Sequence, residues 1–441
     1  MRVGRLYRQE KARYLENRPR SVEMLKRGRA VMPNGTPMTW MVGLYDHIPM
    51  YVREGSGACF TDVDGHRYLD MNHADMSMSC GYGVPAIVDA VSRQVREGTQ
   101  FLLPHELAIE VSSLLAERFG LPYWQYTLSA SQANKECINI ARRHTGRTKI
   151  LTFDGSYHGH IPETLGAHPF VSKPDHTIDS IKVQFNDLKS VEAALGSGDV
   201  ALVLLEPAMT NISLIKPNKG FLEELRQMTR NFGTLLLADE THTHVCAWGG
   251  LTREWSIDPD LVVAGKSIAG GIPMGVYGMT GAVSKTVEAN TEFDHWPEDY
   301  IGDLALGGTL FGNPLGLAAA RAAITQVLTE DGYKRSAGLG KHLADGIDHI
   351  IGKHELPWQA FRLFCRSGVC YSDTLPRNAL EASAIADFDL NRLQRLFMAN
   401  RGIWEAIVTA GPAVSFAATK EDVDFYLQVF EELVEAVFTP G

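Results

Sequence analysis

Two apolar runs of strand length lie in the middle of the chain, and each leads to one ionisable residue. The first covers residues 234–238 and ends at Asp239. The second covers residues 261–264 and continues through one glycine to Lys266. Continuous apolar runs are typical of strands buried on both faces, as in a parallel sheet. Because open parallel sheets bind ligands at the carboxyl ends of their strands, we expect the acid and the amine at one edge.

A lysine and a carboxylate at one sheet edge are the pair that pyridoxal phosphate requires. A lysine can form a Schiff base with an aldehyde. A neighbouring carboxylate can hold a protonated ring nitrogen, which lets the ring accept electrons. Taken singly, a surface lysine and a capping aspartate are the commoner case, since most such side chains are solvated. The interpretation therefore depends on motifs elsewhere in the chain.

Composition restricts the class of protein. A chain of 441 residues exceeds what one hydrophobic core usually supports, so we expect at least two domains. The formal net charge of −10 argues against a nucleic-acid binder, which needs a basic face. The N-terminus lacks a signal-peptide core, and no apolar run approaches the roughly 18 residues of a membrane span. The six scattered cysteines form no metal-binding pattern, so we expect free thiols, no metal and a cytoplasmic location.

The pattern of helices and strands predicts an α/β fold. Strands are expected at residues 124–128, 149–153, 200–205, 234–238, 261–264 and 276–280, with helices at 86–96, 107–119 and 221–232. This alternation indicates a mostly parallel sheet flanked by helices. Helices at 315–328, 337–351, 385–400 and 421–437, with short strands at 360–363 and 414–417, indicate a smaller α+β domain. A helix over residues 1–30 and a hairpin over 51–70, turning at Asp64-Gly65, are expected before the large domain.

We therefore predict three parts. Residues 1–70 form an N-terminal segment that packs with the small domain, residues 71–315 form the large cofactor-binding domain, and residues 316–441 form the small α+β domain.

Three further motifs suit a phosphate and a planar ring. Ser129 and Gln132 fit a capping box, and a helix N-terminus with nearby hydroxyls can bind phosphate, although an ordinary cap explains them as simply. Tyr157 follows a predicted strand, where an aromatic ring can stack on a cofactor. Residues 306–314 form a glycine-rich turn that contains Thr309, and its amides can approach an anion. Each motif also occurs in ordinary loops.

Together, these segments resemble the class III aminotransferases of pyridoxal phosphate fold type I. The match uses the segments at 129–134, 157–159, 239–240, 266–275 and 308–314, in that order. The likeness is greatest to the subgroup around glutamate-1-semialdehyde aminomutase, whose opening is echoed at 32–35, 62–65 and 68–70. It covers the chain from about residue 30 to the C-terminus.

The resemblance implies a role for each matching residue. Lys266 would carry pyridoxal 5'-phosphate and move the substrate proton, and Asp239 would pair with the ring nitrogen. The other cofactor contacts would come from residues around the ring and the phosphate: Ser129, Ala130, Ser131, Tyr157, His158, Glu206 and Thr241. Tyr157 and Thr241 would lie on opposite ring faces. Thr309 would reach the phosphate of the neighbouring subunit, so a homodimer with shared active sites is implied.

The chain departs from the family pattern in three places. The usual Ser-Gly-Thr-Glu is Ser129-Ala-Ser-Gln132, which keeps the anion-binding geometry but loses one charge. The family's Thr-Gly-Phe-Arg is replaced by residues 243–246, which contain no arginine. The subgroup often has an arginine near Met38, where residues 37–40 are apolar or hydroxylic. Arginine is the preferred bidentate partner of a carboxylate, so recognition of an α-amino acid should differ here.

The leading hypothesis is a transaminase that passes an amino group from an amine or amino acid to a keto acceptor. The apolar residues around Met38, Trp40 and Tyr45 suggest a pocket for a bulky donor, a β-amino acid or a D-amino acid, although core packing explains them equally well. His242 and His244 would bind a substrate oxygen or serve the structure. An aminomutase or racemase of the same fold is the alternative. A nucleotide-binding oxidoreductase or a silent binding protein is a third hypothesis, but no GxGxxG motif follows the early strands.

Overall fold

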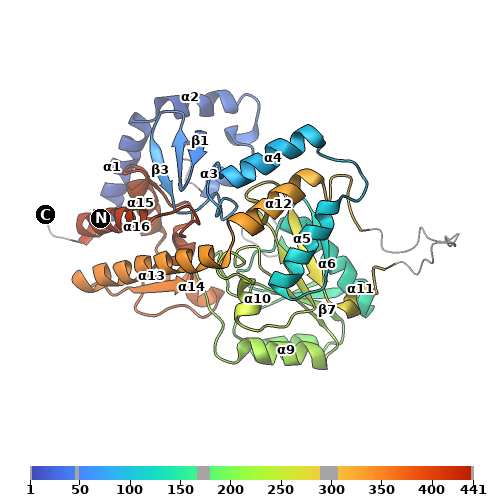
Figure 1. Cartoon of the computed structure of the whole chain (residues 1–441). Helices are drawn as coiled ribbons and strands as arrows, with labels where there is room; N and C mark the ends of the chain where they lie inside the picture. The colour runs from blue at the N-terminus through green and yellow to red at the C-terminus, as the bar shows by residue number, and fades with distance from the viewer. Residues whose placement is uncertain (1, 45–48, 166–178, 289–305, 439–441) are drawn as a thin grey trace. The chain divides into compact units, whose positions relative to one another are not determined.

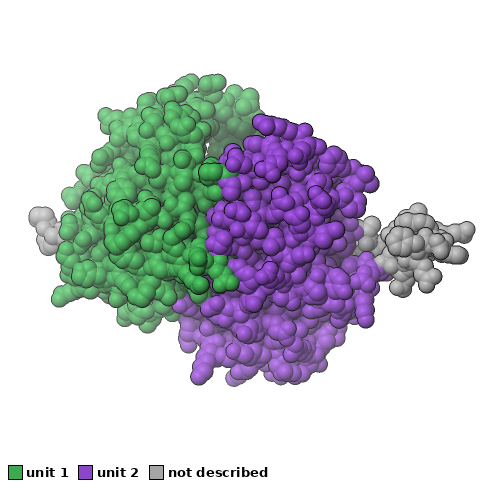
Figure 2. All heavy atoms as spheres, viewed as in Figure 1, with its two compact units in different colours: residues 1–85, 330–376, 382–441 green, residues 86–329, 377–381 purple. Residues whose placement is uncertain are grey.

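The computed structural model describes residues 2–44, 49–165, 179–288 and 306–438. The chain divides into two compact units, coloured separately in Figure 2. Unit 1 comprises residues 1–85, 330–376 and 382–441, and unit 2 comprises residues 86–329 and 377–381. The predicted domain limits at residues 70 and 315 stay predictions.

Unit 2 is built around a seven-stranded sheet. Its strands, in spatial order, are β4 (Tyr123–Thr127), β10 (Gly275–Met279), β9 (Leu261–Ala264), β8 (Leu235–Asp239), β7 (Val200–Leu205), β5 (Lys149–Phe153) and β6 (Ser180–Val183). The five strands from β9 to β6 are parallel, and β10 runs antiparallel to both of its neighbours. The expected α/β fold with a mostly parallel sheet is confirmed.

Helices flank this sheet (Figure 1). The helices in this part of the chain are α4 (Pro85–Glu97), α5 (Glu106–Phe119), α6 (Ala130–Thr145), α7 (Pro162–Leu165), α8 (Leu188–Leu195), α9 (Phe221–Asn231), α10 (Gly250–Glu254), α11 (Gly281–Ser284) and α12 (Pro314–Gln326), of which α5, α6, α8 and α9 contact strands of the sheet. Helix α6 buries one apolar face against alternate residues of the central strands, among them Leu235, Leu237, Leu261 and Val263. Because side chains alternate along a strand, the next residue on that face of β8 is Asp239.

The direction of β10 could not be taken from its apolar pattern. Only residues 265–274 connect β9 to β10, and they contain a four-residue 3-10 helix, η3 (Lys266–Ala269), rather than a crossover helix. A parallel partner needs a connection of a dozen or more residues, so a short link favours the antiparallel pairing. Strand β6 was not predicted, because its four residues are all only half-buried.

Unit 1 contains a four-stranded sheet, a two-stranded sheet and several helices (Figure 1). The larger sheet has the order β1 (Val52–Ser56), β2 (Cys59–Asp62), β3 (Arg67–Asp70) and β13 (Ile403–Trp404), and the smaller pairs β11 (Gln359–Leu363) with β12 (Arg366–Cys370). The helices are α1 (Arg2–Glu16), α2 (Pro19–Gly28), η1 (Pro33–Gly35), α3 (Trp40–Leu44), α13 (Glu330–Lys353), α15 (Phe388–Ala399), η5 (Val408–Ala410) and α16 (Lys420–Phe438). Helix α14 (Ala379–Ile385) has residues in both units.

Three expectations for unit 1 need correction. The N-terminal helix is two helices, because Pro19 begins a new one. The hairpin over residues 51–70 has three strands, with a turn at Gly57 in addition to the expected turn at Asp64-Gly65. The strand at residues 414–417 is wrong: only Ala413 forms an isolated bridge, to Arg366, and the apolar side chains that follow are core residues.

All six cysteines are buried as thiols, as their scattered spacing predicts. Within the described ranges, no helix has the length and apolar character needed to cross a membrane.

Candidate active site

Asp239 and Lys266 lie at the same edge of the seven-stranded sheet. Asp239 is the last residue of β8 and pairs with Val263 of the parallel neighbour β9. The backbone N–H of Glu240 donates to the Val263 carbonyl oxygen at 2.8 Å, which continues the pairing one residue further. Lys266 follows the end of β9 by two residues. The carboxyl ends of two adjacent strands therefore carry the acid and the amine, as the two apolar runs predict.

The backbone at Lys266 has an uncommon conformation. Lys266 is half-buried and has φ = 52°, in the left-handed region that non-glycine residues seldom adopt. It begins η3, and Gly270 and Gly271 after the helix also have positive φ. Strain of this kind is concentrated at functional sites, where the surrounding structure holds it in place.

Asp239 is buried but is held in its charged form. Its Oδ2 atom accepts hydrogen bonds from Asn134 Nδ2 and His158 Nδ1, both at 2.9 Å. Its Oδ1 atom accepts from the backbone N–H of Thr241 at 3.0 Å and from the Thr241 hydroxyl. Burial by itself raises the pKa of the Asp239 carboxyl, but the bonds from His158, Thr241 and Asn134 outweigh it and the pKa is lowered.

The loop that carries Tyr157 is anchored by a buried glutamate. The Tyr157 N–H donates to Glu206 Oε1 at 2.9 Å, while its ring is 37% exposed and so accessible for stacking. Glu206 also accepts from the Thr210 hydroxyl and from Asn211 Nδ2. Burial raises the pKa of Glu206 despite the lowering by nearby His158. The Glu206 side chain thus positions the loop by accepting a hydrogen bond from the loop's backbone. The sequence alone could not assign this contact.

The turn before α6 has the expected cap. Ser129 Oγ accepts from the N–H of Gln132 at 3.4 Å, and Gln132 Oε1 accepts from the N–H of Leu128 at 3.1 Å. Ser129, Ala130 and Ser131 are half-buried. Ser131 Oγ accepts the N–H of His160 at 3.1 Å, which ties the Tyr157 loop to the helix N-terminus. The first amides of α6 and these hydroxyls form an arrangement suited to phosphate.

Two glycines allow this turn to lie close to the sheet edge. A Cβ added to Gly265 would lie 3.0 Å from Ala130 Cβ, and one added to Gly275 would lie 2.4 Å from the carbonyl carbon and oxygen of Ser129. Gly265 is the residue before Lys266. The close packing thus brings the predicted phosphate turn against the strand end that carries the lysine.

The two histidines after Asp239 are buried. His242 Nδ1 lies 2.7 Å from Thr210 Oγ1, and His244 Nε2 lies 3.3 Å from Ser267 Oγ. Burial lowers the pKa of His244 to about 3, so its ring is neutral at physiological pH. These contacts favour the structural interpretation of His244. His242 remains a candidate for substrate binding through its place after Thr241.

The contacts described so far do not involve the remaining predicted site residues, Thr309, Met38, Trp40 and Tyr45. Thr309 is exposed, and its carbonyl oxygen accepts from Gln100 Nε2 at 2.7 Å. Met38 and Trp40 belong to unit 1 and are 45% and 41% exposed. Tyr45 lies outside the described residues.

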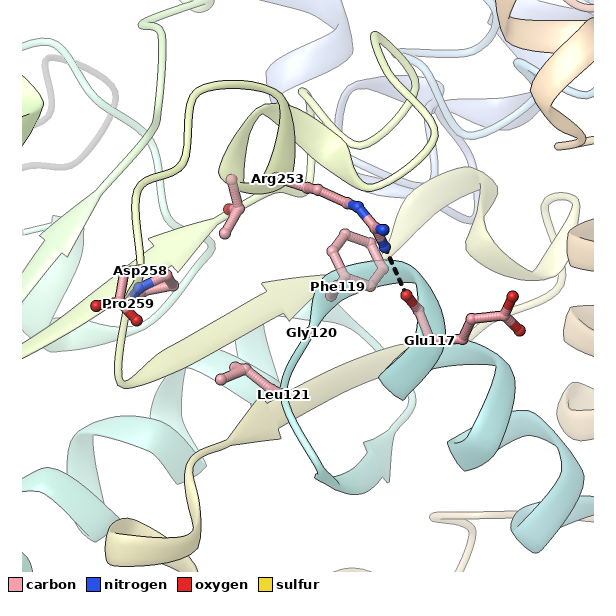
Figure 3. Close-up of a pocket in the computed structure, with 8 residues that line it drawn as sticks. Glu117, Phe119, Gly120, Leu121, Arg253, Asp258 and Pro259 are labelled. Atoms are coloured by element: carbon pink, nitrogen blue, oxygen red, sulfur yellow. Dashed lines mark hydrogen bonds between the residues drawn. The ribbon is translucent and has the colours of Figure 1, made fainter.

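A separate hollow lies at the other edge of the same sheet. It has a volume of about 440 Å³ and adjoins the segments that lead into the amino-terminal ends of β4 and β9 (Figure 3). It is lined by Glu117, Phe119, Gly120, Leu121, Thr252, Arg253, Asp258 and Pro259. Arg253 donates to the Glu117 carbonyl oxygen there at 2.7 Å. The strand directions place it away from Asp239 and Lys266.

Comparison with known proteins identifies the family. The model of the class-III aminotransferase family matches residues 42–359.

The chain belongs to the class-III aminotransferases.

Similar proteins of this family cover nearly the whole chain. The glutamate-1-semialdehyde 2,1-aminomutase of Chloroflexus aggregans is 31% identical, and the alignment covers 95% of this chain and 98% of the aminomutase. The solved structure of a glutamate-1-semialdehyde aminomutase from Pseudomonas aeruginosa is 34% identical with a TM-score of 0.90, covering 99% and 98% of the two chains. A β-phenylalanine aminotransferase from Variovorax paradoxus is 25% identical with a TM-score of 0.89, covering 98% and 97%.

The residues of this class-III enzyme fit the cofactor of the family, pyridoxal 5'-phosphate. The ionised Asp239 suits a protonated ring nitrogen, and the turn before α6 suits a phosphate. His158 Nε2 and Asn134 Oδ1, beside Asp239, are buried and have no hydrogen-bond partner among the described residues. Unpartnered buried polar atoms are rare, so their presence beside the acid is expected of a site that holds another molecule.

Sequence reasoning missed Asn134 and Thr210. Asn134 stands one helical turn after Ala130, and this spacing places both on one face of α6. This spacing is the sequence signal that could have identified Asn134 as a site residue. Thr210 lies in an irregular segment after β7, where the sequence offers no periodic pattern.

Proposed function

We propose that this class-III enzyme is a transaminase that moves an amino group from an apolar amine, β-amino acid or D-amino acid to a keto acceptor. The observation that carries the proposal is the placement of Lys266 and the ionised Asp239 on adjacent strand ends. Bound pyridoxal 5'-phosphate supplies an aldehyde for the amino group and a ring that accepts electrons.

Each residue of the site has a part in this proposal. Lys266 would hold the cofactor covalently, and its amine would then be the group that moves the substrate proton. Asp239 keeps the ring nitrogen protonated, because its low pKa leaves it charged at neutral pH. Tyr157 and Thr241 would pack against the cofactor ring. Ser129, Ala130 and Ser131 hold the phosphate through the first amides of α6 and their hydroxyls.

The proposal of an apolar amino donor rests on two side chains of unit 1, Met38 and Trp40. Met38 and Trp40 are large apolar side chains that remain substantially exposed in a segment where the subgroup often has an arginine. Without a guanidinium, this segment has no bidentate partner for a substrate carboxylate. Apolar contact with a bulky donor is the interaction that these two side chains can make.

Replacing the lysine tests the central chemistry. Lys266→Ala should remove the visible absorbance of the covalently bound cofactor and abolish its bleaching by any donor. Lys285→Ala, at an exposed lysine of the same unit, is the matched control and should keep both. A Lys266→Ala protein with wild-type absorbance and wild-type bleaching would remove the basis of the proposal.

Aminomutase activity is the second candidate, and the similar proteins named glutamate-1-semialdehyde aminomutase favour it. The two activities differ in their need for an acceptor. A transaminase given a donor alone stops after one equivalent of cofactor is converted, and it resumes when a keto acid is added. An aminomutase or racemase turns over its single substrate without an acceptor. A screen of amines, β-amino acids, D- and L-amino acids and glutamate-1-semialdehyde, each with and without a keto acid, decides between them.

We also propose a cytoplasmic homodimer with shared active sites. In unit 2, five apolar side chains form what we call the apolar surface: Phe101, Leu102, Leu103, Ile109 and Leu310 are 48%, 70%, 74%, 74% and 52% exposed. The bond from Gln100 to the Thr309 carbonyl oxygen joins two of its segments. Exposed apolar side chains of this kind suit an interaction site, and Thr309, the neighbour of Leu310 in the chain, would reach the phosphate of the other subunit.

A further inference from the structure

The hydrogen bonds around Asp239 use the whole capacity of its carboxylate. An ionised carboxylate has about four lone-pair positions, two on each oxygen. Asn134 and His158 occupy those of Oδ2, while the N–H and the hydroxyl of Thr241 occupy those of Oδ1. A ring nitrogen that donates to Asp239 must therefore displace one of these four donors.

The four donors differ in how easily they can leave. Asn134 is fully buried, and its Nδ2 atom also donates to the His158 carbonyl oxygen at 2.9 Å, so its amide is held at two points. The Thr241 backbone N–H is fixed by the chain after β8. The Thr241 hydroxyl is half-buried and can leave Oδ1 by one rotation about its Cα–Cβ bond. It is the donor that is displaced with the least rearrangement.

We propose that Asn134 is a positioning residue, which holds Oδ2 of Asp239 and leaves Oδ1 for the ring nitrogen in place of the Thr241 hydroxyl. This inference rests on the proposed role of Asp239. Helix α6 then serves both ends of the cofactor, since Ala130 stands at its first turn and Asn134 lies one turn further on the same face. The distance between the phosphate turn and the acid is set by a single rigid element.

Two substitutions with opposite expected effects test the proposal. Asn134→Leu removes a hydrogen bond to a charged group, so we expect pyridoxal 5'-phosphate to bind about 10- to 100-fold more weakly to the apoprotein. Thr241→Val removes the hydroxyl that the ring must displace, so binding should become about 2- to 10-fold tighter. Binding is measured by quenching of tryptophan fluorescence, and the pH midpoint of the bound cofactor's visible absorbance is measured in parallel.

The matched control is Asn139→Leu, at a half-buried asparagine of the same helix. It should keep the wild-type affinity and midpoint, whereas Asn134→Leu should shift the midpoint. Asn134→Ala, which leaves room for water, replaces Asn134→Leu if the larger side chain prevents folding. Wild-type affinity and an unmoved midpoint in the Asn134 variant, or weaker binding in Thr241→Val, would overturn the inference. If the wild-type protein does not bind the cofactor at all, it is the proposed function that fails.

Discussion

Gly275 of β10 lies against the carbonyl group of Ser129, at a distance that leaves no room for a side chain. A Cβ at position 275 would be 2.4 Å from both the carbonyl carbon and the oxygen of Ser129, and 2.5 Å from Thr127 Oγ1. All these atoms belong to the backbone or to a hydrogen-bonded hydroxyl, so none can move aside cheaply. The strand next to the one that leads to Lys266 therefore fixes the turn that we assign to phosphate.

We expect Gly275→Ala to displace this turn. The overpacking should destabilise the protein by about 1–3 kcal/mol, and cofactor affinity should fall because the first amides of α6 move. Gly281→Ala is the matched control, since a Cβ there meets only Tyr123 Cε2 at 3.6 Å, an ordinary contact. Fluorescence titration with pyridoxal 5'-phosphate and thermal unfolding measure both effects. Equal affinities for the two variants would refute the assignment of this turn.

Arg18 is the buried anchor of the N-terminal helices within unit 1. It is 2% exposed, donates to the Tyr68 hydroxyl at 2.7 Å and lies 3.6 Å from the fully buried Asp62. Arg18→Met leaves the carboxylate buried without its cation, so we expect a loss of about 3–5 kcal/mol in the free energy of unfolding. Arg20→Met, at an exposed arginine of the same segment, should change it by less than about 0.5 kcal/mol. Urea unfolding of both variants checks the difference, and equal midpoints would contradict it.

Glu405 should make the stability of the protein depend on pH. Its Oε2 atom accepts from Gln394 and Tyr426, and burial raises its pKa to about 7. An acid with a raised pKa in the folded state favours folding while it is protonated. The stabilisation is present below its ordinary pKa of 4.5 and is lost as the pH rises through about 7, at most roughly 3 kcal/mol.

Glu405→Gln should remove this dependence. The difference in melting temperature between Glu405→Gln and the wild type should therefore shift in favour of the variant between pH 5 and pH 8. Glu192→Gln, at an exposed glutamate, should follow the wild type at both values. A Glu405→Gln protein whose melting temperature changes with pH as much as that of the wild type would show that this carboxyl does not titrate in the window.

The apolar surface of unit 2 predicts the oligomeric state. Leu103→Glu combined with Ile109→Glu places two charges where both side chains are 74% exposed, so we expect a dimer to dissociate into monomers. Leu380→Glu alters another leucine, 65% exposed, outside this surface and should leave the dimer intact. Sedimentation velocity measures the mass. A wild-type protein that sediments as a monomer would remove the shared-site proposal.

The sequence predicts the bounds of a strand well where the apolar run is continuous and the pattern is local. The apolar runs at 200–205 and 261–264 correspond to β7 and β9 at both ends, since full burial leaves no polar residue within either strand. The direction of β10 and the missing strand at 414–417 depend on which segments become neighbours, a property that local periodicity does not encode. The hydrogen bond from Asn134 to Asp239 likewise depends on which segments become neighbours, because Asn134 reaches Asp239 only through the packing of α6 on the sheet.

The pairing of β3 with β13 has a consequence for the order of events on the ribosome. Leu69 can pair with Cys59 of β2 as soon as both are synthesised, but its pairing with Ile403 must wait for the synthesis of β13. Residues 86–329, by contrast, emerge as one stretch that contains all the strands of the seven-stranded sheet of unit 2. Nascent chains can therefore complete the seven-stranded sheet early, while one edge of β3 stays unpaired until β13 has been synthesised. A chain truncated before residue 403 would leave that edge of β3 without its parallel partner.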